Sequence, residues 1–457
     1  MKVLLHNGSE VCASDVELGS GSMGSVHATD DGKGVVKLFH RPTKDLEASM
    51  DLILERYNCS VDRMHPERNS YWSALYAWPT AIVTHPRLGL IIPRYPAECK
   101  NLIELFGGKN YRDLPEAEQR WNVRVLIAWR LAQGVARLHL MGLAHSDLSH
   151  NNVRANFATG QVRIIDLDGL VVPDHKPPDV LGTRGYMAPE VLAGRAMPSI
   201  ATDKHALAVL LYRLLLFRHP LEGKHNFGLD PDEDGEAIEA AALGEGGIYI
   251  DHPTDQRNRP KNMYSASMLG PTLTRLFEQA FVQGLRSPGD RPRADEWKTA
   301  LGRLLDRLVP CADASCAEHY YPLAEGRASR CPWCDSSLAI RGGIPVLRLY
   351  EPGPKQPAPI TDFWIAGYHG RTLHVWHSAK GAEPDPFSDQ DPIGRIENGK
   401  SGWSLTNIKC AGLAKLDSVG KSIRSIPLGQ SVELREGTIL RLGDPPSARL
   451  VLVQWVN

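Results

Sequence analysis

Asp147, Asn152 and Asp166 are the residues whose types and spacing suggest chemistry most directly. The string "HSDLSHNN", residues 145–152, has the pattern H-x-D-x-x-x-x-N, and Asp166 follows the apolar run "RII". The Asp147 carboxylate can orient a hydroxyl group or accept its proton, whereas Asn152 and Asp166 can hold a metal ion. Because side chains alternate along an extended strand, Asp168 points the same way as Asp166 and is the alternative metal ligand. We choose Asp166, which directly follows the strand. The pattern indicates a carboxylate that acts on a hydroxyl group beside a metal ion.

A glycine-rich string, "LGSGSMGSVH", supplies a second half for such a site. Its three glycines and the valine after them are Gly19, Gly21, Gly24 and Val26. Glycine lets backbone N–H groups approach phosphate oxygens where a Cβ atom would collide. We expect a β-hairpin lid over a nucleotide, with Val26 packed on the purine. Lys37 in "VVKLF", on the next strand but one, would reach the α- and β-phosphates.

Four of the eight cysteines cluster with the spacing C-x4-C-x14-C-x2-C: Cys311, Cys316, Cys331 and Cys334. In a reducing compartment such a cluster indicates a metal rather than disulfides. Two short hairpin knuckles would bring four thiolates to a tetrahedral Zn²⁺ ion, in a closed site with no open position for chemistry. We therefore expect a structural zinc site, with His319 in place of one cysteine as the alternative.

The framework for these residues follows from the hydrophobic pattern, which predicts an α+β protein in four parts. Residues 1–96 combine short β-type runs, such as "GVVKLF" and "LGLIIPRY", with a helix over 43–57. From 97 to 308 the period is mostly 3.6, which predicts a larger helical part. The cysteine segment, 309–340, follows. The last part, 341–457, alternates apolar residues with glycine turns, a pattern typical of antiparallel strands in a sandwich.

The string "GTRGYMAPE", residues 182–190, completes a set of five ordered motifs. With it, residues from about 12 to 305 resemble a protein serine/threonine kinase of the eukaryotic-like type found in bacteria. Small-molecule kinases of the aminoglycoside and choline type share the His-x-Asp and metal-Asp pattern but lack this peptide-docking segment, so the expected substrate is a protein. The resemblance implies a bilobal kinase fold, with 1–96 as the N-lobe and 97–308 as the C-lobe, that uses ATP and Mg²⁺.

The resemblance also implies roles for individual residues. Asp147 is the catalytic carboxylate, Asn152 and Asp166 hold Mg²⁺, and Lys37 positions the phosphates. In "DLEASMDLILERY" the acidic residues Glu47, Asp51 and Glu55 recur at four-residue spacing, on nearly one helix face. We expect Glu47 to pair with Lys37, and Glu55 is the alternative.

Two further residues match the family outside the motifs. Asp203 opens the apolar helix "DKHALAVLL", where the family uses an aspartate to brace the catalytic-loop backbone. Arg291 in "DRPRADEW" matches the arginine that pairs with the Pro-Glu glutamate, here Glu190.

The sequence departs from the family pattern around the catalytic loop. Ser149 stands where these kinases usually carry a lysine, and Ser146 replaces the arginine that receives a phosphorylated activation loop. The loop itself, residues 170–181, contains no Ser, Thr or Tyr. Because a phosphate acceptor and a cation to bind it are both missing, we predict constitutive activity or control by another domain. Ser149 and "DLDG", which replaces Asp-Phe-Gly, motivate the alternative of a nucleotide-binding pseudokinase scaffold.

The β-rich tail resembles a forkhead-associated domain. Arg395 in "IGR" and Ser404 could retain part of a phosphothreonine contact, but the family's Ser-x-x-His element is missing because no histidine follows His377. We expect an interaction or docking module. Kinase, zinc ribbon and tail together resemble the kinase of a bacterial phosphorylation triad linked to tellurium-resistance proteins. That resemblance implies a von Willebrand factor A-domain protein as partner or substrate and a metal-dependent protein phosphatase as the opposing enzyme.

Composition excludes other classes of partner. The 457 residues carry a formal net charge of -1, so no overall field attracts nucleic acid or acidic lipid. The longest apolar run, "ALAVLLYRLLLF", is shorter than the roughly 20 residues that span a bilayer and is interrupted by Arg213. It predicts a buried helix. The N-terminus lacks the apolar core of a signal peptide, and we expect a cytoplasmic protein with neither nucleic-acid nor membrane partners.

Overall fold

The computed structural model describes residues 1–21, 23–175, 181–224, 242–324, 330–338, 343–353, 357–417 and 421–456. The chain divides into two compact units. The first unit comprises Met1–Leu114, Ile127–Met263 and Phe277–Asp295, and the second comprises Pro115–Leu126, Tyr264–Leu276 and Glu296–Asn457. These units do not follow the four predicted domains one for one, and the predicted boundaries stay predictions. Within the described ranges, no helix has the length and apolar character needed to cross a membrane.

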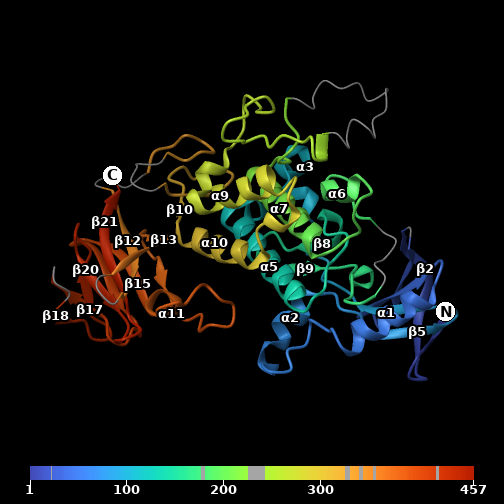
Figure 1. Ribbon diagram of the computed structural model, residues 1–457. Helices are drawn as coiled ribbons and strands as arrows, with labels where there is room; N and C mark the ends of the chain where they lie inside the picture. The colour runs from blue at the N-terminus through green and yellow to red at the C-terminus, as the bar shows by residue number, and fades with distance from the viewer. Residues whose placement is uncertain are drawn as a thin grey trace. The chain divides into compact units, whose positions relative to one another are not determined.

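The first unit begins with a closed barrel of six antiparallel strands in the order β1-β2-β3-β4-β6-β5, drawn in blue in Figure 1. The strands are β1 (Lys2–Leu5), β2 (Glu10–Ser20), β3 (Gly24–Thr29), β4 (Gly34–Phe39), β5 (Ala81–His85) and β6 (Gly89–Pro93). Alternate apolar side chains, among them Val3, Val36 and Val83, are buried together in a small core. The strands predicted from "GVVKLF" and "LGLIIPRY" are thus confirmed as β4 and β6.

The described residues between β4 and β5 form two α-helices, where one was predicted. Helix α1 (Lys44–Glu55) begins after Thr43, whose side chain accepts a hydrogen bond from a backbone N–H of the first turn. The helix buries Met50 and Ile53. Two short elements separate α1 from β5: η1 (Pro66–Arg68) and α2 (Asn69–Leu75).

Helices dominate the described part of residues 97–308, which confirms the predicted 3.6 period there. The two long helices are α5 (Trp121–Leu140) and α7 (Ile200–Leu216), and α7 buries nearly all of the apolar run in the predicted way. The shorter helices are α3 (Gly108–Arg112), α4 (Glu116–Gln119), α6 (Pro189–Leu192), α9 (Pro271–Glu278) and α10 (Ala294–Asp306). Single turns are η2 (Leu102–Leu105), η5 (Ala266–Leu269), η6 (Gln279–Gln283) and η7 (Pro288–Asp290).

A three-stranded sheet in the order β7-β8-β9 carries the central motifs of the first unit. Its strands are β7 (Lys100–Asn101), β8 (Val153–Ala155) and β9 (Val162–Ile164), with η3 (His150–Asn152) before β8 and η4 (Leu167–Gly169) after β9. Val153 pairs with Ile164 in the antiparallel register of β8 and β9, and the Ile165 N–H donates to the Asn152 carbonyl oxygen at 3.0 Å. This hairpin places Asn152 and Asp166 at the same end of the sheet.

The second unit contains two larger antiparallel sheets, drawn in orange to red in Figure 1. One has the order β13-β12-β21-β20-β17-β18 and the other β14-β15-β16-β19, and a two-stranded sheet, β10-β11, precedes them. The strands are β10 (Leu308–Pro310), β11 (Tyr320–Pro322), β12 (Ile344–Glu351), β13 (Ala358–Ala366), β14 (Thr372–Leu373), β15 (Gly394–Gly399), β16 (Gly402–Asn407), β17 (Ala414–Leu416), β18 (Ser422–Ser425), β19 (Ser431–Glu433), β20 (Ile439–Leu442) and β21 (Arg449–Val456), with helix α11 (Val375–Ser378). Side chains from all three sheets share one hydrophobic core.

Candidate active site and metal centre

Lys37 lies on β4 with its ammonium group between two carboxylates. Its Nζ atom is 2.6 Å from Asp166 Oδ1 and 2.7 Å from Asp168 Oδ2. The side chains of Lys37, Asp166 and Asp168 are 10%, 41% and 1% exposed. Although burial opposes the charge, the two carboxylates raise the pKa of Lys37 above its ordinary value. The structure therefore joins Lys37 to the predicted Asp166 and also to Asp168.

The two aspartates differ in environment. Burial raises the pKa of Asp168, whereas the Lys37 ammonium overcomes burial and holds the pKa of Asp166 below its usual range. Our premise that Asp166 and Asp168 lie on an extended strand, with their side chains on the same side, was wrong, because β9 ends at Ile164. Asp166 has a left-handed backbone with φ 61° and immediately precedes the turn η4. Both carboxylates reach one ammonium group through this turn.

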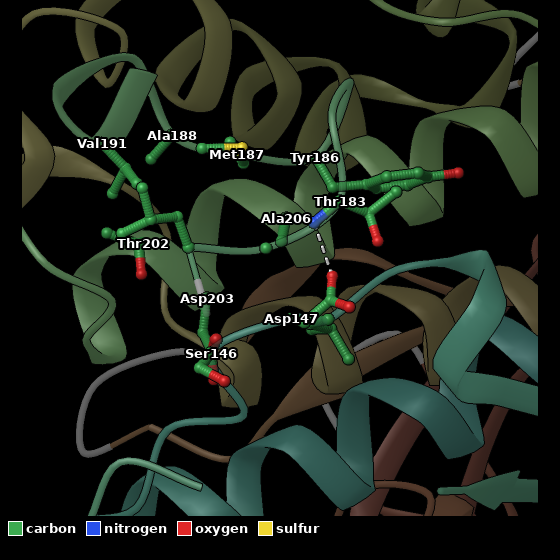
Figure 2. A pocket seen from close by; sticks show the side chains of 13 residues that line it. Ser146, Asp147, Thr183, Tyr186, Met187, Ala188, Val191, Thr202, Asp203 and Ala206 are labelled. Atoms are coloured by element: carbon green, nitrogen blue, oxygen red, sulfur yellow. Dashed lines mark hydrogen bonds between the residues drawn. The ribbon is translucent and has the colours of Figure 1, made fainter. Parts of the chain in front are cut away.

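Asp147 and Asn152 are held together by two hydrogen bonds. Asn152 Nδ2 donates to Asp147 Oδ2 at 2.9 Å and to the Asp147 carbonyl oxygen at 2.8 Å. Asp147 Oδ1 accepts from the backbone N–H of Thr183 at 2.7 Å, the contact drawn as a dashed line in Figure 2. Because Asn152 uses its amide nitrogen on Asp147, the amide oxygen is the atom suited to a cation.

A small hollow lies beside Asp147. It is lined by residues of the catalytic loop, of the "GTRGYMAPE" segment and of α7, including Ser146, Met187 and Ala206 (Figure 2). Its volume is about 10 Å³, enough for about one water molecule. The segment that follows the activation loop therefore packs closely on the catalytic loop.

Asp203 braces the catalytic loop, as the resemblance implies. Its Oδ2 accepts from the backbone N–H of His145 at 2.6 Å and lies 3.2 Å from His139 Nε2. His145 is buried, and its Nε2 lies 2.9 Å from the Ile165 carbonyl oxygen. These contacts fix the backbone immediately before Asp147, and the prediction for Asp203 is confirmed.

The two serines that depart from the family pattern are both engaged. Ser149 is buried and its Oγ accepts from the Thr183 hydroxyl at 3.1 Å. The Ser146 hydroxyl donates to the Gly169 carbonyl oxygen at 2.6 Å. Each serine ties the catalytic loop to the chain around the activation loop. Residues 176–180 of that loop lie outside the described residues.

Arg291 and Glu190 form the predicted pair. Arg291 Nη1 and Nη2 each donate to one Glu190 carboxylate oxygen at 2.7 Å, and the Arg291 side chain is fully buried. Its Nε also donates to the Gly284 carbonyl oxygen at 2.7 Å. This bidentate geometry is the strongest form of an arginine–carboxylate contact.

The glycine-rich string forms the ends of two paired strands, β2 and β3, although Ser22 within it is not described. A Cβ atom at Gly24 would lie 2.5 Å from the Leu38 carbonyl oxygen, whereas at Gly19 and Gly21 no atom of the described residues lies within 4 Å of that position. Gly24 is therefore required by strand packing, and Gly19 and Gly21 leave room for a ligand. Val26 on β3 lies directly opposite Lys37 on β4, so the two side chains share a face.

The glutamates of helix α1 do not contact Lys37. Glu47 and Glu55 lie on the exposed side of α1, and within the described residues neither forms an ion pair with Lys37. The expected Lys37–Glu47 pairing, and its Glu55 alternative, are absent from the geometry of this structure.

The arrangement fits a magnesium-bound nucleotide. Asp168 Oδ1 is buried without a hydrogen-bond partner among the described residues, and Asp166 is open to solvent beside it. Together with the Asn152 amide oxygen, the Asp166 carboxylate provides oxygen ligands of the kind that Mg²⁺ prefers. Lys37 and the open backbone at Gly19 and Gly21 would face the phosphates.

The four predicted cysteines meet at one point. The sulfur atoms of Cys311, Cys316, Cys331 and Cys334 all lie within 4.8 Å of one another. Two of these separations are 3.5 Å, between Cys311 and Cys334, and 3.8 Å, between Cys316 and Cys331. A tetrahedral ion with bonds of about 2.3 Å to sulfur requires separations of about 3.8 Å, so the cluster fits zinc. His319 instead lies 3.1 Å from the Glu116 carboxylate.

Arg395 and Ser404, the residues singled out in the tail, lie on neighbouring strands. Arg395 is exposed on β15 and pairs with Thr406, while Ser404 on β16 pairs with Glu397. All four side chains share one face of this sheet. The Glu397 carboxylate accepts a hydrogen bond from Thr406 at 3.0 Å, which places a negative charge on the same face.

Three contacts at the site were not predicted: Asp168 with Lys37, the Thr183 N–H with Asp147, and His219 with the Gly185 carbonyl oxygen at 2.8 Å. The additional acidic residue in "DLDG" is visible in the sequence as a departure from Asp-Phe-Gly. It suggested Asp168 as an alternative metal ligand, but not as a partner of Lys37. A backbone donor such as Thr183 leaves no trace in residue type. His219 is one of seventeen histidines and carries no motif.

The fold and site geometry together define a class of protein, and comparison with known families agrees. Residues 98–266 match the family described as the protein kinase domain. That range includes Asp147, Asn152, Asp166 and Glu190, but not the glycine-rich string or Lys37. The chain therefore contains a protein kinase domain, with mixed helix and strand content.

Individual relatives support the serine/threonine class. The chain is 32% identical over 122 residues to serine/threonine-protein kinase PSK1 of Saccharomyces cerevisiae, covering 25% of this chain and 9% of that protein. It is 33% identical over 101 residues to CBL-interacting serine/threonine-protein kinase 1 of Arabidopsis thaliana, covering 21% and 22%. A bacterial relative, the serine/threonine-protein kinase drp72 of Corynebacterium efficiens, is 24% identical over 213 residues, covering 45% and 39%. The chain thus spans well under half of the length of these relatives.

Proposed function

We propose that this protein is a serine/threonine protein kinase that transfers the γ-phosphoryl group of ATP to a hydroxyl of a partner protein in a bacterial signalling or stress system. The observation that carries the proposal is the convergence at one site of Lys37, Asp166 and the Asp147–Asn152 pair. The kinase-domain match and the names of the relatives support the same class.

The chemistry follows from the positions of these groups. Asp147 would accept a hydrogen bond, and finally the proton, from the substrate hydroxyl, whose oxygen forms a bond to the γ-phosphorus as the bond to the β-phosphate oxygen breaks. Lys37 would orient the α- and β-phosphates. Asn152 and Asp166 would hold Mg²⁺, which neutralises charge on the phosphates when bound. ADP and a phosphorylated protein are the products.

Replacement of Asp147 tests the proposal. With radiolabelled ATP and a candidate protein substrate, Asp147→Asn should lose roughly two to four orders of magnitude in transfer, the usual contribution of a positioned proton acceptor. Affinity for ADP should stay close to wild type, and Asp30→Asn, at an exposed position of the first unit, is the matched control. Transfer that survives in Asp147→Asn would contradict the assigned role.

A nucleotide-binding pseudokinase scaffold is the second candidate. The observation in its favour is Ser149, which is buried on Thr183 where the family usually has a lysine. The wild-type protein separates the candidates, because a scaffold would bind ADP but transfer no phosphate to any protein. A small-molecule kinase would instead phosphorylate a soluble alcohol and ignore protein.

The second unit carries the remaining proposals. We propose that the four cysteines hold a structural Zn²⁺ in a ribbon, supported by the spacing of their sulfur atoms. The two larger sheets, which follow the cysteines in the sequence, are proposed to form a sandwich that resembles a forkhead-associated domain and docks partner proteins. The von Willebrand factor A-domain protein and the opposing phosphatase remain proposals that rest on the family resemblance alone.

A further inference from the structure

We propose that Asp168 is the positioning partner of Lys37, in the place that a helix glutamate takes in related kinases. The inference rests on the proposed nucleotide-binding site and deepens it. It assigns a role to the additional acidic residue of "DLDG", and it makes the position of Lys37 independent of helix α1.

The burial of the three charged groups separates the two aspartates. Asp168 is 1% exposed and bonds Lys37 at 2.7 Å, whereas Asp166 is 41% exposed and bonds it at 2.6 Å. A buried carboxylate needs a compensating charge, and Lys37 is the cation that lies against Asp168. Asp168 can therefore keep this contact permanently. Asp166 is partly exposed, so its carboxylate has room to turn from Lys37 towards a metal ion.

The packing of α1 points the same way. The helix uses Met50 and Ile53 as its buried face, which leaves Glu47 and Glu55 on the exposed side. To bring either glutamate to Lys37, the helix would have to rotate and expose apolar side chains to water.

Hydrogen bonds and an ion pair also hold the chain after α1 against the helix α5. Arg137 on α5 donates from Nε to the Cys59 carbonyl oxygen at 2.9 Å and from Nη2 to the Val61 carbonyl oxygen at 3.0 Å. Its Nη1 lies 3.5 Å from Asp62 Oδ2, and its guanidinium lies 4.3 Å from the centre of the Trp72 ring. A movement of α1 towards Lys37 would strain these contacts. These contacts are consistent with a site that does not use the helix as a switch.

Nucleotide binding by the full-length protein tests the assignment. Affinity for ADP is measured by calorimetry with and without Mg²⁺ in wild type, Asp168→Asn and Asp166→Asn. We expect Asp168→Asn to weaken ADP binding roughly tenfold, the loss of one charge-assisted contact, and to keep the gain that Mg²⁺ gives. Asp166→Asn should lose that gain. In steady-state assays Asp168→Asn should raise KM for ATP more than it lowers kcat.

The rival pairing is tested by Glu47→Gln and Glu55→Gln, with Asp51→Asn as the matched control on the same helix. A tenfold loss of ADP affinity in either glutamine variant, with Asp168→Asn unchanged, would overturn the proposal. Competitive acylation of Lys37, followed by mass spectrometry, gives a readout that does not depend on nucleotide or activity. Lys37 should be modified faster in Asp168→Asn than in wild type at the same pH, because one of the two carboxylates that hold its ammonium group is then missing. Equal rates would also overturn the proposal.

A simple folding defect is distinguished by a double variant. Suppose that Asp168→Asn lowers the melting temperature. The double variant Lys37→Met/Asp168→Asn should then have a melting temperature closer to wild type than Lys37→Met alone, because the double variant leaves no buried Asp168 charge without its partner. Lack of such recovery counts against the pair. A wild-type protein that binds ADP through this pair but transfers no phosphate would defeat the proposed kinase activity and leave the Asp168 assignment standing.

Discussion

Arg291 and Glu190 show at the scale of single residues how a pair far apart in sequence can stabilise the kinase domain. Arg291 is fully buried and makes two hydrogen bonds to Glu190, one to Gly284 and one to the Ala201 carbonyl oxygen at 2.9 Å. Removal of one partner leaves the other without compensation in a site away from water. We expect Arg291→Ala to cost about 3–5 kcal/mol of stability, and to lower the melting temperature by roughly 10 °C in calorimetry.

The control for this prediction lies two residues away. Arg293 is exposed and pairs with the exposed Asp295 at 3.1 Å. Such surface pairs contribute little, so Arg293→Ala should change stability by less than about 0.5 kcal/mol. If Arg291→Ala and Arg293→Ala melted at the same temperature, the buried pair would not be the stabilising contact that its geometry indicates.

The sequence predicts residues best where one short string holds both the residue and its environment. Asp147, Asn152 and Asp166 were predicted to lie at one site because an apolar strand and a fixed spacing mark them. The partner of Lys37 was not predicted, because the orientation of α1 depends on which side packs on the barrel. Spacing showed that Glu47 and Glu55 share a face but not that Met50 and Ile53 would be the buried side. The contact between Lys37 and Asp168 depends on the left-handed backbone of Asp166, which cannot be predicted from the residue type.

At the scale of elements, His219 connects the end of α7 with the segment that holds Thr183. Its Nε2 lies 2.8 Å from the Gly185 carbonyl oxygen, and its Nδ1 accepts from the Leu221 N–H at 3.2 Å. A ring that accepts at one nitrogen and donates at the other is neutral. Burial lowers the pKa of His219, and that of the buried His205 in α7 lies well below its ordinary value for the same reason.

These histidines predict that the kinase domain loses stability in mild acid. Below about pH 6.5 these histidines bind protons in the unfolded chain but stay neutral in the folded one. The free energy of unfolding therefore falls as pH falls. The slope is up to about 1.4 kcal/mol per pH unit for each histidine. Urea unfolding between pH 7.5 and 5.5 measures it. His219→Gln should reduce the slope, whereas His65→Gln, at an exposed position, should keep it. Stability that stays constant over this range contradicts the prediction.

The whole molecule is where the sequence was least informative. Composition changes along the chain marked a cysteine segment at 309–340 and a β-rich tail at 341–457, and each was predicted as a separate domain. In the structure Cys316 and Cys331 belong to the same hydrophobic core as Leu347 and Val451 of the sheets. Trp333, which lies between Cys331 and Cys334 in the sequence, packs on Trp121 with ring centres 5.5 Å apart. A hydrophobic pattern identifies buried residues, but it does not show which segments bury them together.

The shared core leads to the last prediction, which concerns the proposed zinc. If Zn²⁺ binds the four sulfur atoms, it contributes folding energy on the order of 10 kcal/mol to the segment that holds them. Because that segment is part of the core of the sheets, chelation should unfold the second unit as a whole rather than the cysteine segment alone. Elemental analysis should give about one zinc per chain, and a chelator should change the tryptophan fluorescence and the circular dichroism of the strands together. Cys331→Ser should reproduce this effect, whereas Cys12→Ser, at an exposed position in the barrel, should keep both zinc and stability. Less than half a zinc per chain, or strands that persist after the metal has gone, would show that the sheets fold without it.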